Sequence, residues 1–438
     1  MSHEPITSRV IAGQQIRPFP PDPSNPTPGP DPVVLIPGAV GPHPQDRRSL
    51  RFSQRDLSTN ILVSGAIGAG KTTLLLHLAA QVRRRLGPDD GLLIFDSKGD
   101  FLAHLHRPGD VVIAPRAGSP FLDRWNVFEE LVDEGDAAEI SALLFADRVA
   151  HSTQSFFPRA AAQIFEGVLL HLHRRNRPAD RHNALLRETW DAADSPERIA
   201  ANLSEHADLR ALTAYLARPD TEMALGIYAE AQQVVRALFV DAFADPGTIG
   251  VRAFARQPRG RALFVVHDVA RGETLSPGYQ IMFDMALKEI LSRSRPRGHL
   301  YIIADEAALL PRLRLLASGL NFGRSLGLSI IWAVQSVSQI LAGYETHTAH
   351  SILAGFGTQV VFRLNDAATR DHVQRLLGRN LTMFTVPTWA NDNSVVHHVL
   401  ERPVLDDAFI ATLPTGRALV LRPPDAPAWL QLDPFGER

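Results

Sequence analysis

Short apolar runs alternate with helical patterns in two separate stretches of the chain. In the first stretch, apolar runs at 60–64, 92–95 and 111–114 indicate buried strands, and residues 72–85 have the spacing of an amphipathic helix. In the second stretch the runs are 262–266, 300–304, 329–334, 359–362 and 417–421, with helical patterns at 279–292, 309–325 and 367–377. Strands that alternate with helices are typical of a parallel sheet with helices on its faces. We therefore predict an α/β fold.

The pattern changes between these two stretches. Residues 127–255 lack strand-like runs and are rich in Ala, Leu, Glu and Arg, which predicts helices at 137–149, 160–174, 196–203 and 223–244. The sequence thus predicts an α/β domain made of residues 33–126 and 256–422. An all-α domain of residues 127–255 is inserted into it, and residues 423–438 form a Pro-rich tail.

The N-terminal segment, residues 1–32, has a composition that opposes folding. Eight of residues 18–32 are proline, and proline removes the backbone donors that strands and helices need. We predict a flexible arm, with a docking strand for a partner as the alternative.

Charge and composition exclude several classes of protein. The 45 basic and 47 acidic residues nearly cancel, so no global positive field indicates nucleic acid, although a ring can confine basic residues to its pore. The chain has no cysteine, which excludes disulfides, Cys-ligated zinc and thiol nucleophiles. It has no apolar run of the roughly 18 residues that span a bilayer. We expect a soluble, cytoplasmic protein.

One motif predicts a nucleotide site. Gly65-Ala66-Ile67-Gly68-Ala69-Gly70-Lys71-Thr72 matches Gly-x4-Gly-Lys-Thr between a predicted strand and a predicted helix. Glycines let backbone amides surround phosphate oxygens at a helix N-terminus, and we predict that residues 65–73, ending at Thr73, bind ATP. Lys71 is placed to contact the β- and γ-phosphates, and the Thr72 hydroxyl to bind Mg²⁺. Only three of the 45 basic residues are lysines, which suggests that Lys71 is specifically required.

A second motif supplies two carboxylates. The apolar run 300–304 ends in Asp305 and Glu306. We predict that Asp305 holds Mg²⁺ and that Glu306 accepts a proton from the attacking water. The alternative is that these residues cap the following helix. Gln335 ends another apolar run and is predicted to orient that water, or else to cap its strand. Arg324 is either an arginine finger that reaches a neighbouring subunit or a surface arginine.

Together these residues resemble the conjugative coupling proteins, the TraD/TraG-like ATPases of type IV secretion, over residues 58–422. Further motifs carry the resemblance: Phe95-Asp96-Ser97-Lys98-Gly99-Asp100 after the second strand, Phe156-Phe157-Pro158 at the start of a long helix, and Gly323-Arg324-Ser325-Leu326-Gly327 with Gln335-Ser336. The resemblance implies a P-loop NTPase of the RecA-like type with an additional strand and a catalytic glutamate. It also implies a homo-hexamer that hydrolyses ATP with Mg²⁺ to move DNA or nucleoprotein into a secretion channel.

Members of this family usually begin with transmembrane helices, whereas this chain begins with the proline-rich arm. We therefore expect a membrane partner to recruit it to the inner face of the cell membrane. The all-α domain is expected to contact cargo, either a relaxase or an effector protein. A small-molecule kinase is disfavoured, because a kinase needs no water-activating glutamate such as Glu306. Two alternatives stay open: a HerA/FtsK-like DNA pump outside secretion, and a cargo adaptor in which ATP acts as a switch.

Candidate contacts for DNA are three groups of arginines, at 83–85, at 174, 175 and 177, and at 293, 295 and 297. Each group is also explained by a solvated helix end. No sequence-reading DNA motif is recognised, so contacts to phosphates that weaken with salt are expected. The histidines, among them His151, His171 and His173, show no metal-ligand spacing and are predicted to be core or surface residues.

Overall fold

The structure is a computed structural model that describes residues 7–14, 17–18, 34–39, 50–116, 121, 123–216, 218–219, 221–387 and 395–436. The chain forms two compact units. The first contains residues 1–85, 303–308 and 329–438, and the second contains residues 86–302 and 309–328. The proline-rich stretch 19–33 of the predicted arm lies outside the described residues.

The sheet of the first unit has three parallel strands at its centre. The strand β6 (Ile61–Ser64) lies between β11 (Leu328–Val334) and β12 (Thr358–Val361), and Ile61 pairs with Ile331 on one side and with Thr358 on the other. Within this unit the strand order is β2-β16-β15-β12-β6-β11-β10, where β10 is Leu300–Ala304 and only its last two residues belong to the unit. The strands β15 (Arg417–Leu421) and β16 (Ala428–Leu432) continue it antiparallel, and β2 (Arg17–Pro18) and β4 (Gly38–Ala39) pair with β16.

Helices and a small two-stranded sheet surround these strands. They are α1 (Gln54–Ser58), α2 (Lys71–Arg85), α13 (Val337–Gly343), α14 (Thr346–Ala354), α15 (Ala367–Leu377), α16 (Asp407–Ala411) and the pair β3 (Val34–Ile36) and β5 (Leu50–Phe52). The apolar face of α2 is buried. Its Gln81 side chain both donates to and accepts from the backbone of Leu35, 2.6 and 2.8 Å away. These contacts fix the helix that follows the predicted P-loop.

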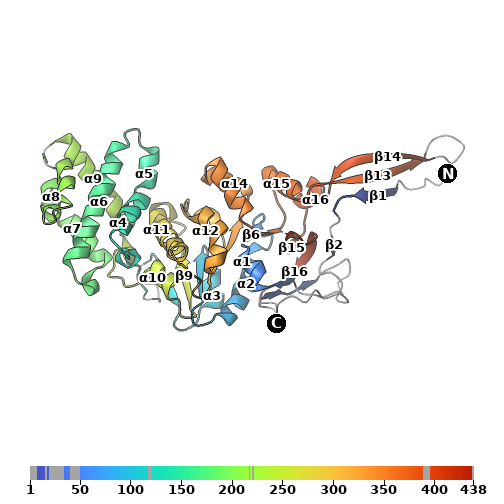
Figure 1. Cartoon of the computed structure of the whole chain (residues 1–438), viewed down its shortest axis with the longest axis horizontal. Coiled ribbons are helices and arrows are strands. Elements are labelled where there is room, and N and C mark those ends of the chain that lie inside the picture. Colours follow the sequence, from blue (N-terminus) through green and yellow to red (C-terminus); the bar gives the residue numbers. More distant parts are fainter. Residues whose placement is uncertain are drawn as a thin grey trace. The chain divides into compact units, whose positions relative to one another are not determined.

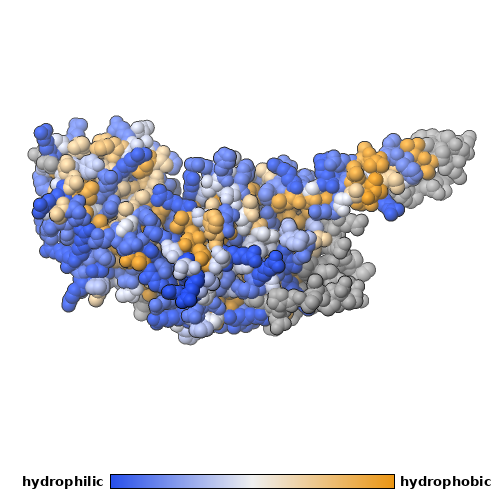
Figure 2. All heavy atoms as spheres, viewed as in Figure 1, coloured by the Kyte–Doolittle hydropathy of each residue, from blue (hydrophilic) through white to orange (hydrophobic). Residues whose placement is uncertain are grey.

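A three-stranded antiparallel sheet corrects part of the predicted flexible arm. The strand β1 (Thr7–Ala12) pairs with β13 (Arg379–Pro387), which pairs with β14 (Val395–Pro403). The residues of β1 have backbone partners in β13, from Thr7 opposite Thr385 to Ala12 opposite Leu381, which explains why this part of the arm forms a strand. Apolar side chains stay exposed on this sheet, where Figure 2 shows them gathered, among them Leu381, Val399 and Leu400.

The second unit has three parallel strands that are buried except at Val266, the last residue of β9. They are ordered β7 (Gly91–Asp96), β9 (Ala262–Val266) and β8 (Val111–Ile113). Residues buried on both faces of a parallel strand read as a continuous apolar run, which is why these strands were predictable. The other elements of this unit include α3 (Asp100–Leu105), α10 (Val251–Arg256), α11 (Gly272–Leu291), α12 (Leu316–Phe322) and the 3₁₀ turn η6 (Gly323–Leu326). A further 3₁₀ turn, η5 (Ala307–Leu309), begins in the first unit and ends in the second.

Between β8 and β9 the described chain is helical. The elements are η1 (Val127–Glu130), α4 (Gly135–Leu144), α5 (Ala146–His151), α6 (Phe156–Arg175), η2 (Pro178–Asp180), α7 (Asn183–Ala192), α8 (Pro196–Ser204), η3 (Arg210–Tyr215), α9 (Glu222–Leu238) and η4 (Asp241–Phe243). Figure 1 shows these helices side by side, and α6 packs against α4, α8 and α9. The long helix predicted from the Phe156-Phe157 motif begins at Phe156.

A hydrogen-bonded neck closes this helical segment. Trp125 forms an isolated parallel bridge with Ile249. The Asn183 side chain donates to the backbone oxygens of Trp125 and Phe243, at 2.8 and 2.9 Å. The buried carboxylate of Glu130 accepts from the Trp125 indole and from two backbone amides of α10, and burial raises the pKa of Glu130 to about 7. The entry and exit of the segment are therefore held together.

Several helix and strand boundaries differ from the predictions. The helix expected at 137–149 is two helices, α4 and α5, which meet at the buried Phe145, where φ is −99° and ψ is 4° instead of the values of an α-helix. The helix expected at 309–325 is α12 alone with flanking 3₁₀ turns, since Pro311 cannot continue a helix. The helix expected to begin at 279 begins at Gly272, and the one expected to end at 244 ends at Leu238. The predicted tail contains the strand β16.

None of the helices in the described part of the chain has the length and apolarity needed to cross a membrane.

Candidate nucleotide-binding site

The loop between β6 and α2 has the backbone of a phosphate-binding cradle. Gly68 and Gly70 have φ angles of +72° and +119°, which other L-residues rarely adopt. Gly65 is required for another reason, because a Cβ there would lie 2.7 Å from the Cβ of Phe362. The glycines of the motif are therefore explained by turn geometry and by close packing.

Residues far away in the sequence hold this loop in place. The amide of Gly65 donates to the oxygen of Val334, and the amide of Ala66 donates to the oxygen of Arg363 at 2.7 Å. On the other side the amide of Gly416 donates to the oxygen of Ala69 at 2.9 Å. Arg363 and Gly416 could not be predicted as part of the site, because neither belongs to a local sequence motif.

Lys71 is the first residue of α2 and only 8% of it is exposed. Its ammonium donates to the backbone oxygens of Gly65 at 2.7 Å and of Ala66 at 3.3 Å. The charge therefore lies inside the loop that the sequence predicts for the phosphates. Ile67, at the tip of the loop, is 73% exposed.

The two predicted Mg²⁺ ligands are in contact. Asp305 follows β10 and is buried, and the Thr72 hydroxyl donates to its Oδ1 at 3.0 Å. These residues are separated by 233 positions in the sequence. A hydroxyl and a carboxylate are the oxygen ligands that Mg²⁺ takes, so the donor set fits that ion.

Glu306 and Gln335 form a second contact beside the first. The Gln335 amide donates from Nε2 to Oε2 of Glu306 at 2.9 Å. The other oxygen, Oε1, is buried and has no hydrogen-bond partner among the described residues. A buried carboxylate oxygen without a partner is costly, and it is suited to accept a hydrogen bond from a water molecule. The structure thus brings together four of the five residues predicted as catalytic: Lys71, Asp305, Glu306 and Gln335.

The segment after Gln335 is anchored by residues that the sequence did not single out. Ser336 and Ser338 donate their hydroxyls to Oδ2 of Asp366, at 2.7 and 3.2 Å. The amide and hydroxyl of Thr369 donate to the same oxygen, at 2.8 and 2.6 Å. These hydrogen bonds, above all those of the Thr369 and Ser336 side chains, lower the pKa of Asp366 to about 2. A lone Asp before a helix looks like an ordinary N-cap, so no sequence signal marked it.

We expect Asp366→Asn to destabilise the protein, because an amide oxygen is a weaker acceptor than a carboxylate for these donors. The folded-state pKa lies below the ordinary value of 3.8, so this stabilisation is fully present above about pH 4 and is lost as the pH falls towards 2. Thermal unfolding of both proteins between pH 7 and pH 3 should show a difference that is constant above pH 4 and shrinks below it. Asp371→Asn, an exposed site on the same helix, is the control. A difference that grows as the pH falls would contradict the assignment.

Other predicted residues lie elsewhere. Arg324 is exposed on η6 in the second unit. Asp96 is buried and accepts hydrogen bonds from the amides of Gly99 and Leu102 at the start of α3, both at 2.8 Å. These bonds hold the turn after β7, which is a sufficient reason for an aspartate at this position. Lys98 is exposed. Lys288 pairs with Asp136 and Glu139 and joins α11 to α4.

A parallel sheet with a glycine-rich loop leading from β6 into a helix, and an acid pair at the end of β10, which is separated from β6 by one strand, β11, defines a P-loop protein of the RecA-like type. The family described as the type IV secretion-system coupling protein DNA-binding domain matches residues 48–393. The chain therefore belongs to the coupling-protein family of type IV secretion systems. A search of curated proteins finds no match.

Solved structures share the fold of this chain. A trigonal form of the bacterial conjugative coupling protein TrwBdeltaN70 with sulphate is 22% identical, with a TM-score of 0.74 over 98% of this chain and 95% of that one. TrwB with ADP and Mg²⁺ is 20% identical, with a TM-score of 0.73 over 99% and 96%. VirB4 of Thermoanaerobacter pseudethanolicus is 13% identical, with a TM-score of 0.58 over 93% and 98%.

Proposed function

We propose that this coupling protein binds ATP with Mg²⁺ and hydrolyses it to move DNA, or DNA bound to protein, towards a type IV secretion channel. One observation carries the proposal: Thr72 of the P-loop and Asp305 of the acid pair lie 3.0 Å apart, although 233 positions separate them. A sequence that resembled a P-loop only by chance would not be expected to place the Asp305 carboxylate next to the Thr72 hydroxyl. TrwB, which has the same fold, has been solved with ADP and Mg²⁺.

Each residue of the site has a distinct task in this proposal. The Lys71 ammonium leaves its two backbone partners to contact the β- and γ-phosphates. Thr72 and Asp305 hold Mg²⁺, which neutralises phosphate charge when bound. Glu306 uses its buried Oε1 to accept a proton from water, while Gln335 keeps the carboxylate oriented.

A ring of identical subunits, which we propose to be a hexamer, gives Arg324 a function. The residue is exposed on a short 3₁₀ turn, where its guanidinium can reach a neighbouring subunit. Stabilisation of transition-state charge from the neighbour would link hydrolysis to assembly.

The family's description as a DNA-binding domain supports DNA as the substrate. The structure reduces the number of arginines that are candidates for contacts to DNA. Arg174 already pairs with Glu134 and Asp208, Arg175 with Glu205 and Arg177 with Asp180, which satisfies their charges locally. Arg84, Arg295 and Arg297 are exposed and are the better candidates for contacts to phosphates.

We expect DNA to raise the rate of ATP hydrolysis, and added salt to abolish the increase, because contacts to phosphates release counterions. The measurement is phosphate release with no DNA, single-stranded DNA and double-stranded DNA at rising salt, together with the mass of the assembly in solution. Stimulation restricted to one DNA form would identify the substrate. If neither form of DNA changes the rate of ATP hydrolysis at low salt, the proposed DNA-moving function is contradicted.

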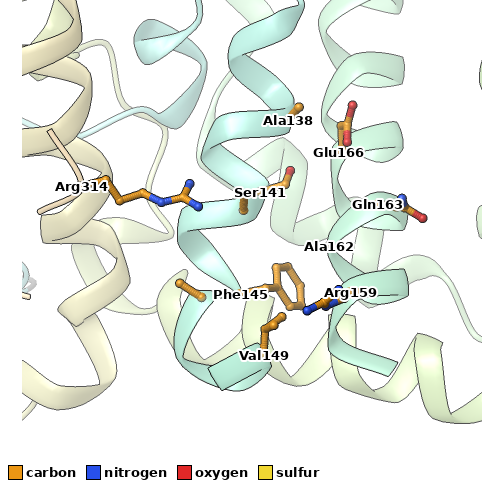
Figure 3. A pocket seen from close by; sticks show the side chains of 11 residues that line it. Ala138, Ser141, Phe145, Val149, Arg159, Ala162, Gln163, Glu166 and Arg314 are labelled. Atoms are coloured by element: carbon orange, nitrogen blue, oxygen red, sulfur yellow. The ribbon is translucent and has the colours of Figure 1, made fainter. Parts of the chain in front are cut away.

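A cavity in the helical segment favours a second candidate, a cargo adaptor. The cavity has a volume of about 450 Å³ and is lined by residues of α4, α5 and α6 and by Arg314. Figure 3 shows lining residues, among them the small Ala138. Arg159, Gln163 and Glu166 add polar groups, and burial raises the pKa of Glu166. A side chain of a relaxase or an effector protein fits a cavity of this size. The adaptor predicts that Glu306→Gln leaves cargo binding unchanged.

We further propose that a membrane partner recruits the protein to the inner face of the cell membrane, where a secretion channel begins.

A further inference from the structure

A histidine of α6 meets two consecutive residues that follow α8 in the helical segment of the second unit. They are His171 on α6, and Glu205 and His206 directly after α8. Their nearest ligand atoms all lie within 4.8 Å of one another. His171 is 2% exposed, whereas Glu205 is exposed and His206 is half-buried. The cluster is therefore open to solvent on one side only.

The geometry of the two imidazoles fits a metal ion. Nδ1 of His171 lies 3.2 Å from Nε2 of His206. In a tetrahedral zinc site with bonds of about 2.0–2.1 Å, neighbouring ligand atoms are roughly 3.3 Å apart. Oε2 of Glu205 lies 3.9 Å from Nδ1 of His171, so a small side-chain movement would complete three ligands.

The surroundings hold the three ligands in place. The other oxygen of Glu205 accepts from Arg175 at 2.6 Å, which orients the carboxylate as outer-shell partners of metal ligands do. Gly167, one helical turn before His171, lets α6 approach α8 closely, since a Cβ there would lie 2.9 Å from Leu203. The amide of His206 donates to the oxygen of Leu203 at 3.1 Å, which fixes the turn that carries both later ligands.

We propose that His171, Glu205 and His206 bind one divalent transition-metal ion of the zinc class, with a fourth position left for water or for a ligand from another molecule. Two nitrogens and one carboxylate oxygen suit zinc, whereas Mg²⁺ prefers oxygen ligands alone. The site is thus distinct from the proposed Mg²⁺ site at Asp305. The bound ion ties the end of α6 to the segment after α8.

The test is titration of the purified protein with Zn²⁺, and with Co²⁺ as a spectroscopic probe, in millimolar Mg²⁺. We expect one ion per chain, visible ligand-field bands of Co²⁺ bound by nitrogen, and a melting temperature raised by about 3 °C or more at saturating Zn²⁺. His206→Gln should weaken binding at least about 100-fold and remove the bands, and Glu205→Gln should weaken it less.

His151→Gln is the matched control, since His151 is exposed on α5 and lies outside the cluster. Glu205 is exposed and His206 is half-buried, so we expect both variants to fold. An unchanged melting temperature in the absence of metal verifies this for each variant. One-to-one binding that survives His206→Gln, or no binding at micromolar Zn²⁺, would overturn the proposal. Neither readout uses ATP, so this result is independent of the proposed motor activity.

Discussion

Lys71→Ala should reduce ATP turnover roughly 1,000-fold or more, because it removes the one ammonium that the loop holds next to the phosphates. In the structure this ammonium is almost completely buried and bonded to the oxygens of Gly65 and Ala66. No other side chain of the motif carries charge. Turnover and nucleotide affinity are measured with the variant and the original protein under the same Mg²⁺ concentration.

Two further variants make this result specific. Lys98→Ala removes another of the three lysines, an exposed one, and should leave turnover unchanged. Lys71→Arg keeps the charge in a chain that uses arginine almost everywhere else. Its planar, branched guanidinium cannot replace a compact ammonium inside the loop, so we expect no recovery. Full activity of Lys71→Arg would show that charge alone suffices and that the scarcity of lysine has no bearing on this position.

Glu306→Gln should lower turnover by about 100- to 10,000-fold while ATP still binds, because it removes a general base and little else. An amide at this position can still accept the hydrogen bond from Gln335 Nε2, so the local structure is retained. The variant loses the carboxylate whose Oε1 is buried without a partner in the described residues. Single-turnover hydrolysis and nucleotide binding, measured separately, distinguish loss of chemistry from loss of affinity.

Glu273→Gln serves as the control for this change, because Glu273 is exposed in the first turn of α11. It should leave both quantities unchanged. If Glu306→Gln lost ATP binding and turnover together, its role would be structural, as a cap after β10. If it kept normal turnover, another base would have to be found.

The elements that the sequence predicted best are those whose residues interact locally or are buried on both faces. The strands β6, β7, β9 and β10 were predictable because a parallel strand covered on both sides is a continuous apolar run. The boundaries of helices were less predictable. At Phe145 a buried residue interrupts a helical pattern, and at Pro311 a proline does, although the surrounding residues would continue the helix in both cases.

The strand β1 and the strand β16 were missed for a different reason. The strand β1 precedes the proline-rich stretch within the predicted arm, and β16 lies in the predicted Pro-rich tail; each forms because another strand offers it backbone partners: β13 for β1 and β15 for β16. Pairing between strands far apart in the chain leaves no periodic signal in either segment alone.

The nucleotide site divides in the same way. The sequence by itself determined the loop 65–72 and its chemistry, because glycines with positive φ, a following helix and a lysine act through local backbone geometry. It also determined that the acid pair Asp305-Glu306 follows the apolar run 300–304. Only the tertiary structure brought three pairs within hydrogen-bond distance: Thr72 with Asp305, Gln335 with Glu306, and Ser336 with Asp366. It also brought His171 to His206. Those contacts depend on the order of strands and on helix packing, which are set by burial summed over the whole chain rather than by any short stretch of it.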